Sequence, residues 1–325
     1  MKNTIGIIIT SIIVITLSVL GFVLGGINLS KTQTNTLIIL LIICASSMAY
    51  CFIIGELVHN NSQMDKLWSI LPIAYTWVIC AMGGFKIRLL IFAIIVTIWG
   101  FRLTFNFARK GAYKLKFWQG EEDYRWAILR KNKYFSKRFI WALFDLLFIS
   151  IYQNLLVLAI CLPALAVMDS NQAFNGFDAL AIGLSLTFIL LEFVADEQQW
   201  KFHQKKKELL ADGKKLEDIE APYNKGFNTT GIWARAKHPN YLGEQGVWMS
   251  LYIFTIGAGV TVYGIFNWTI FAPLFLIFLF LGSSQLGEAI TNSKYPEYKY
   301  YRATVSKYFP LKKYNYEKAK AKLDK

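Results

Sequence analysis

Long apolar segments separated by short polar stretches dominate the chain. Runs of about 20 mainly apolar residues recur, and a helix of that length crosses a hydrocarbon core roughly 30 Å thick. The pattern therefore predicts an all-α protein, a polytopic transmembrane helical bundle of seven or eight spans. The segment at 67–82 has the weakest pattern, which leaves seven spans open beside eight. The predicted helices cover residues 4–25, 36–58, 67–82, 89–107, 139–168, 177–195, 241–263 and 266–283.

Composition supports the same class of protein. Of the 325 residues, 55% are hydrophobic and 16% are aromatic, and the mean hydropathy is +0.37. A soluble domain of this length carries more charge and shorter apolar runs. The four cysteines lie inside apolar runs and are interpreted as small buried hydrophobes (Cys44, Cys51, Cys80 and Cys161). The three histidines are too scattered for a metal cluster, so we expect no metal.

The net charge of +14 is distributed unevenly. Lys and Arg concentrate at 109–138, 201–237 and 294–325, whereas 169–175 contains neither. A basic patch can bind nucleic acid, but in a membrane protein the positive-inside rule is the commoner cause, with anionic lipid headgroups as partners. We therefore expect a multi-pass protein of the cell membrane with both termini in the cytoplasm and no nucleic-acid partner. The exceptions are Lys86 and Arg88, which fall in a short outer turn.

The chain is expected to divide into three parts. Residues 1–60 form N-terminal transmembrane helices, 61–311 form a membrane domain with the motifs described below, and 312–325 form a basic cytoplasmic tail. Within the second part, 201–228 is interpreted as a helix that continues out of the membrane and ends in a loop. The tail is expected to fray or to lie on the membrane surface.

Polar residues at helix ends gather on the predicted cytoplasmic side. These residues are Asp65, Arg102, Glu192 with Asp196, Asn240 with Glu244, and Ser284 with Glu288. The members of each pair are four residues apart, so they share a helix face. Together they predict a cytoplasm-facing pocket, although any single one can simply meet headgroup water. Asp145, Gln153 and Asn154 are interpreted as interhelical hydrogen-bond partners.

One stretch, at 231–244, combines basic residues with a helix start. Pro239 suits the first turn of a helix, where its missing N–H is not needed. The free N–H groups and positive dipole end of such a helix favour an anion. Arg235, Lys237 and His238 add positive charge just before it. The stretch thus indicates a phosphate or pyrophosphate site, and a basic membrane anchor followed by a helix start is the alternative.

The same stretch carries a resemblance to a known family. The run Arg235-x-x-His238-Pro239-Asn240-Tyr241-x-Gly243-Glu244 resembles the signature of steroid 5-alpha-reductase-like membrane enzymes, in particular a bacterial branch of uncharacterised reductases. Four further motifs are similar to that branch: Asp65-x-x-Trp68-Ser69, Trp99-Gly100-x-Arg102, Glu192-x-x-Ala195-Asp196-x-Gln198, and Tyr295-Pro296-Glu297-Tyr298-x-x-Tyr301-Arg302-x-Thr304 followed by Phe309-Pro310. In this order they cover about 65–311.

The resemblance implies a function. It implies a membrane-embedded oxidoreductase that uses NADPH to reduce a conjugated C=C bond in a lipophilic, steroid- or isoprenoid-like substrate taken from the bilayer. It implies that Asp65 and Arg102 are catalytic, with Asp65 acting on the substrate carbonyl and needing a raised pKa to be protonated. The cofactor-binding residues that it implies are Glu192, Asp196, Arg235, His238, Asn240, Tyr241, Glu244, Glu288, Tyr298 and Arg302.

Two other functions remain open. Isoprenylcysteine and phospholipid methyltransferases share an Arg-His-Pro-x-Tyr-x-Gly pattern before a helix and bind S-adenosylmethionine there. The Asp196 motif, Asn240, Glu244 and the larger number of helices favour the reductase. A non-catalytic membrane scaffold is disfavoured by the clustered acidic residues.

Overall fold

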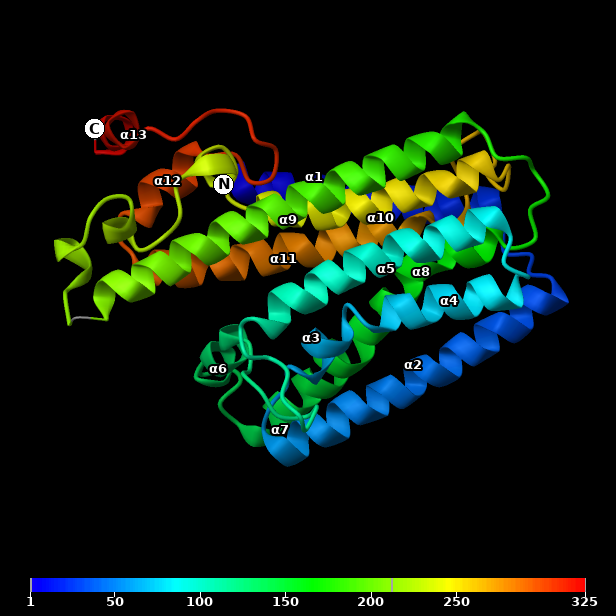
Figure 1. Ribbon diagram of the computed structural model, residues 1–325, viewed down its shortest axis with the longest axis horizontal. Helices are drawn as coiled ribbons and strands as arrows, with labels where there is room; N and C mark the ends of the chain where they lie inside the picture. Colours follow the sequence, from blue (N-terminus) through cyan, green and yellow to red (C-terminus); the bar gives the residue numbers. More distant parts are fainter. Residues whose placement is uncertain (1, 212, 325) are drawn as a thin grey trace. The chain divides into compact units, whose positions relative to one another are not determined.

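The computed structural model describes residues 2–211 and 213–324, with side chains from residue 9 onward, and is helical throughout (Figure 1). In those residues the only β structure is two isolated bridges. The α-helices are α1 Lys2–Gly25, α2 Lys31–Val58, α3 Gln63–Leu67, α4 Leu71–Met82, α5 Ile87–Ala108, α6 Tyr124–Arg130, α7 Arg138–Phe144, α8 Gln153–Val167, α9 Gly176–Leu210, α10 Pro239–Gly257, α11 Phe271–Lys294, α12 Tyr298–Thr304 and α13 Tyr316–Leu323. A π-helix, η1 Asp145–Tyr152, joins α7 to α8, and short 3₁₀ turns are η2 Leu216–Asp218, η3 Tyr223–Lys225, η4 Gly231–Ala234 and η5 Trp268–Ile270.

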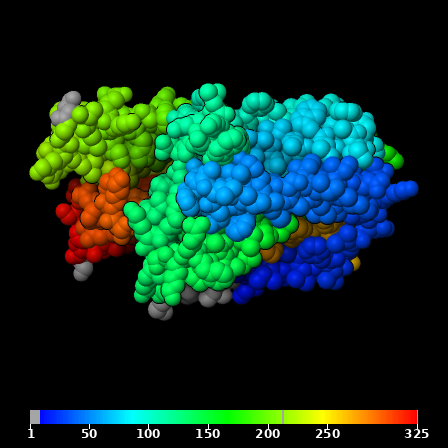
Figure 2. Space-filling view, turned by 90° about the horizontal axis from the view of Figure 1, so that it is seen from below, coloured from blue at the N-terminus to red at the C-terminus, as the bar shows by residue number. Residues whose placement is uncertain are grey.

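The predicted all-helical membrane fold is confirmed. By length and composition, five helical segments of the described chain are suited to cross a membrane: Lys31–Val58, Ile87–Ala108, Arg138–Val167, Gly176–Leu210 and Trp268–Lys294. Two shorter apolar helices are Ile9–Gly25 and Leu71–Met82. Seven or eight spans therefore stay a prediction. Figure 2 shows α2 exposed along one face, and its outward side chains Ile38, Ile42 and Leu57 are apolar, as lipid contact requires.

Several boundaries differ from the prediction. The expected helix at 67–82 corresponds to α4, which begins at Leu71 with Pro72 in its first turn, and the short helix α3 precedes it. Helix α10 ends at Gly257 rather than 263, because Gly259 adopts φ +67° in the turn that follows. Helix α11 continues well past 283, to Lys294. The predicted extension of the sixth helix is confirmed, because α9 runs without interruption to Leu210.

The chain forms two compact units. Unit 1 comprises Met1–Gly183 and Trp248–Leu276, and unit 2 comprises Leu184–Val247 and Ile277–Lys325. In unit 1, α4 packs against α5 and α8, and α2 packs against α8 and η1 (Figure 1). The predicted interhelical hydrogen bond occurs there for Asn154, which donates to Cys51 Sγ of α2 at 3.8 Å, whereas Asp145 accepts from Asn61 Nδ2 in the turn after α2 at 2.8 Å.

A buried ion pair in unit 1 explains Arg88, a residue that the predicted topology places in an outer turn. Its Nε and Nη2 atoms lie 2.7 and 2.8 Å from the carboxylate of Asp178, and both residues are buried. A bidentate pair of this kind neutralises the charge and fixes its geometry. Arg88 is therefore not an unpaired charge, because Asp178 at the start of α9 compensates it.

Candidate functional site

The segment before α10 is held on α9 by hydrogen bonds within unit 2. Trp233 Nε1 donates to the carbonyl of Ala195 at 2.9 Å, and the backbone N–H of Ile232 donates to Gln198 Oε1 at 2.9 Å. The phenol of Tyr301 donates to the carbonyl oxygens of Trp233 and Ala236. Helix α10 then begins at Pro239, as predicted. The 3₁₀ turn η4 and the start of α10 are thereby fixed in place.

The motif residues Asp196 and Asn240 meet where α9 and α10 cross. Asn240 Nδ2 donates to Asp196 Oδ1 at 3.2 Å. The crossing is close because Gly243 has no side chain: a Cβ there would lie 2.6 Å from Glu192 Cβ and 2.9 Å from the carbonyl oxygen of Phe188. Glu192 and Glu244 are both buried near this crossing. The sequence therefore paired the two motifs correctly.

The carbonyl oxygen of the Asn240 side chain has an unusual environment. It is buried, and within the part of the chain that the structure describes no donor contacts it. Leaving a buried acceptor unpaired costs about 1–3 kcal/mol. The orientation of the amide follows from its hydrogen bond to Asp196, which directs Nδ2 to the carboxylate and leaves Oδ1 as the open acceptor. A ligand with an N–H or O–H group can satisfy it.

Glu288 on α11 organises a second cluster. It is 2% exposed and accepts from His238 Nε2 at 3.1 Å, from Lys237 Nζ at 3.2 Å and from Arg302 Nε at 3.0 Å. Lys237 and His238 were expected to hold an external anion, but in the structure their partner is the chain's own carboxylate. Burial lowers the pKa of both, and Glu288 opposes that shift.

A C-terminal strap, residues 304–308, covers this cluster. The backbone N–H groups of Lys237 and His238 donate to the carbonyl oxygens of Ser306 and Lys307 at 2.9 Å each. These two N–H groups before α10 are thus already paired within the chain, whereas the predicted anion site needs free N–H groups. Lys307 Nζ donates to Ser284 Oγ at 3.3 Å. Burial lowers the pKa of Lys307, as do its cationic neighbours Lys237 and Arg302, while Glu288 raises it.

The charges in the cluster are unbalanced. Three cationic side chains, those of Lys237, Arg302 and Lys307, surround the single carboxylate of Glu288. Excess positive charge in partly buried surroundings is relieved when an anion binds. The Arg302 side chain is 36% exposed, so part of it remains open to solvent. The cluster can therefore take a phosphate group in addition to its own carboxylate.

Aromatic rings border the cluster. Tyr241 stacks on His238 with ring centroids 5.1 Å apart and an interplanar angle of 11°. The ring centroids of Tyr241 and Phe280 are 4.6 Å apart. Tyr298, also expected to bind the cofactor, lies instead in a buried cluster with Phe227, Tyr301 and Val305. Arg235 is exposed, and its Nη1 donates to the carbonyl of Leu311 at 3.1 Å.

Asp65 and Arg102 belong to unit 1. Asp65 Oδ2 accepts from Trp126 Nε1 at 2.8 Å, and Arg125 Nη2 lies 4.0 Å from Oδ1. Burial raises the pKa of Asp65, and the charge of Asp123 raises it further, against the effect of Arg125. The pKa of Asp65 is thus shifted in the direction that the resemblance requires, and burial is the main cause. Arg102 is buried on α5.

Sequence reasoning did not identify the neighbours of Asp65. Lys66 is fully buried, and its Nζ donates to the carbonyl oxygens of Phe117 and Gln119 at 2.9 and 2.8 Å. Burial lowers its pKa to about 8, against the effect of Asp65. The only available signal was its place beside Asp65. The four cysteines are free and buried, and among residues 2–211 and 213–324 no group of three or more potential metal ligands occurs.

Comparison with known proteins gives the family. Residues 51–305 match the family described as a protein of unknown function (DUF1295). An uncharacterised protein of Schizosaccharomyces pombe is 36% identical over 262 residues, which are 77% of this chain and 73% of that protein. No solved structure matches. The chain belongs to the DUF1295 family, which includes steroid 5-alpha-reductase-like membrane proteins.

Proposed function

We propose that the protein is an NADPH-dependent membrane oxidoreductase that reduces a conjugated C=C bond of a lipophilic, steroid- or isoprenoid-like substrate. We place it in the bacterial branch of the steroid 5-alpha-reductase-like proteins, on the motifs at 65–69, 99–102, 192–198, 235–244 and 295–310. The observation that carries the proposal is the Asp196–Asn240 pair, with its buried and unpartnered amide oxygen.

The residues of unit 2 fit this cofactor chemically. Asn240 Oδ1 accepts a hydrogen bond from an amide or ribose hydroxyl, and Asp196 holds the amide in the orientation that leaves this oxygen open. Arg302 and Lys307 provide the positive charge that a pyrophosphate needs. Glu288 connects Arg302 of α12 to Lys237 and His238, which precede α10. Bound NADPH supplies the hydride, which is accepted by the beta carbon of an enone.

The substrate role of Asp65 remains part of the proposal. A carboxyl group that donates a hydrogen bond or a proton to a carbonyl must be neutral at working pH. The raised pKa of Asp65 fits that need, and Trp126 Nε1 fixes the orientation of the carboxyl group through Oδ2. We further propose that the protein lies in the cell membrane with both termini in the cytoplasm.

Ligand-dependent thermal stability of the detergent-purified protein tests the cofactor. A ligand that binds only the folded state at about 100 times its Kd adds roughly 2.7 kcal/mol to the free energy of unfolding. NADPH is expected to raise the melting temperature, and S-adenosylmethionine is expected to leave it unchanged. The reverse result would replace the reductase by a methyltransferase. No effect of either ligand would remove both.

A further inference from the structure

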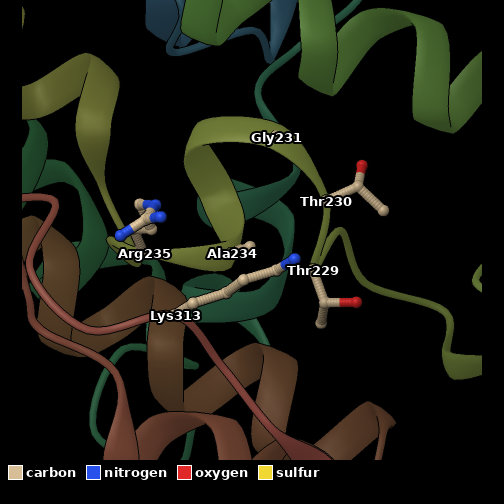
Figure 3. A pocket seen from close by; sticks show the side chains of 6 residues that line it. All are labelled: Thr229, Thr230, Gly231, Ala234, Arg235 and Lys313. Carbon is tan, nitrogen blue, oxygen red and sulfur yellow. The ribbon is translucent and has the colours of Figure 1, made fainter.

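A pocket of about 340 Å³ lies beside η4, on unit 2 (Figure 3). Its lining comes from two segments far apart in the sequence, the approach to α10 and the C-terminal segment. The lining residues are Thr229, Thr230, Gly231, Ala234, Arg235 and Lys313. In Figure 3 the Lys313 side chain extends past Ala234 toward Thr229, with Arg235 on the other side of Ala234.

Hydrogen bonds fix the walls of the pocket. The backbone N–H of Tyr314 donates to the carbonyl of Ala234 at 2.7 Å, and Arg235 Nη1 donates to the carbonyl of Leu311 at 3.1 Å. These two bonds hold the segment that carries Lys313 against the turn that carries Arg235. Gly231 has φ +56°, and a Cβ on it would lie 2.3 Å from Gln198 Oε1, so the turn also seats tightly on α9. A site with fixed walls binds a ligand at a lower entropy cost.

The chemistry of the lining selects an anion. Arg235 and Lys313 are the charged members of the lining, both are exposed, and none of the six residues is acidic. This distinguishes the pocket from the neighbouring cluster, where Lys237 contacts the Glu288 carboxylate at 3.2 Å. The hydroxyl of Thr230 donates to Asn228 Oδ1 at 2.8 Å, so Thr229 is the lining hydroxyl left to serve a ligand.

We propose that this pocket binds a phosphomonoester dianion. Two cations match its two negative charges, and the planar guanidinium of Arg235 suits the oxygens of a terminal phosphate, which accept two parallel N–H bonds. Such a group is carried either by a soluble nucleotide or by the headgroup of an anionic lipid such as phosphatidic acid. The proposal goes beyond the oxidoreductase function, because the pocket takes the phosphate whichever molecule carries it.

Direct binding to two kinds of probe tests the proposal. The soluble probe is adenosine 2′,5′-bisphosphate added to detergent-purified protein, with adenosine as the uncharged comparison. The lipid probe is phosphatidic acid in nanodiscs, with phosphatidylcholine nanodiscs as the comparison. The variants are Arg235→Gln and Lys313→Gln, and the matched control is Lys312→Gln, which removes the same charge from the adjacent exposed residue outside the lining. The melting temperature of each variant without ligand is measured first.

We expect at least one probe to bind, Lys313→Gln to weaken its affinity about 10-fold or more, and Lys312→Gln to leave it within about 2-fold. Arg235→Gln is expected to act in the same direction. The Arg235 side chain bonds the C-terminal segment to the turn, whereas no such bond is observed for the Lys313 side chain in the described residues. Lys313→Gln therefore stays informative even if Arg235→Gln unfolds. A preference for the nucleotide identifies a soluble ligand, and a preference for phosphatidic acid identifies a lipid.

The proposal is overturned if neither probe binds, or if Lys313→Gln and Lys312→Gln behave alike. Its failure is distinct from failure of the proposed function. Binding of NADPH by a protein that binds neither probe in a Lys313-dependent way would remove the phosphate site and keep the reductase. Lys313-dependent binding of either probe by a protein that does not bind NADPH would keep the phosphate site and remove the reductase.

Discussion

Replacing the buried carboxylate of Glu288 is expected to be strongly destabilising. The substitution Glu288→Gln keeps the size of the side chain but turns one acceptor into an N–H₂ donor, which then faces the cationic groups of Lys237 and Arg302. Removing one partner of a buried ion pair costs about 3–5 kcal/mol. The Arg302 side chain is 36% exposed, so solvent screens its interaction with Glu288. We therefore expect Glu288→Gln to lower the free energy of unfolding by about 3 kcal/mol.

Thermal unfolding in detergent measures this effect. For a chain of this size each kcal/mol lowers the melting temperature by about 2 °C, so Glu288→Gln should lower it by roughly 5–8 °C. Glu297→Gln is the matched control, because its side chain is 45% exposed and pairs with Lys225 at 2.8 Å. An exposed pair is worth about 0–1 kcal/mol, so the control should shift by no more than about 2 °C.

A double-mutant cycle separates the charge cluster from a general packing effect. Lys237→Met leaves Glu288 with fewer cations, and the double variant removes both charges. We expect a coupling energy of about 1 kcal/mol or more, since the two groups are 3.2 Å apart and both are buried. The reasoning is refuted if Glu288→Gln and Glu297→Gln unfold at the same temperature. It is also refuted if the destabilising effects of Glu288→Gln and Lys237→Met simply add in the double variant.

Three further predictions concern acid stability, the substrate site and topology. Burial lowers the pKa of His238 in the folded protein from 6.5, so the unfolded chain takes up the proton first as pH falls, and the free energy of unfolding should decline below about pH 6.5. When unfolding is measured from pH 5 to 8, this decline should be shallower in His238→Gln than in the exposed control His203→Gln. Asp65→Asn keeps an oxygen that can accept from Trp126 Nε1, so it should fold normally and bind NADPH while turnover falls by roughly 10²-fold; full turnover in a stable variant would exclude Asp65 from the mechanism. Reporter fusions at Lys325 and after Met168 should read cytoplasmic and external, and an external C-terminus would overturn the proposed topology.

Short-range patterns were sufficient to predict the helices. Each predicted apolar segment contains a helix, and Pro239 begins α10, because span length and first-turn proline are local properties. The short helix α3 was missed, and α4 begins at Leu71 rather than 67, since the apolar residues Trp68 and Ile70 continue the pattern. The tail was expected to fray or to lie on the membrane surface. In the structure α13 packs on α12, where Tyr316 donates to Glu297 at 2.8 Å, and a position on the membrane surface stays a prediction.

Partners that are distant in sequence could not be predicted. Arg88 was an unexplained outer charge until the structure paired it with Asp178. Glu288 was seen only as part of a helix-face pair, and its contacts with Lys237 and Arg302 depend on how the strap crosses the start of α10. Asp196 and Asn240 were the exception, because two adjacent helices each carry a recognisable motif at the crossing.

The binding of NADPH to the wild type and to Asn240→Ala, measured by isothermal titration in detergent, tests the central claim most directly. Loss of the open Asn240 acceptor should cost about 1–3 kcal/mol of binding free energy, an affinity loss of roughly 5- to 150-fold. The matched control Asn171→Ala changes an exposed asparagine of unit 1 and should bind as the wild type does. Equal NADPH affinity in all three proteins, or no binding by the wild type, would contradict the proposed cofactor site.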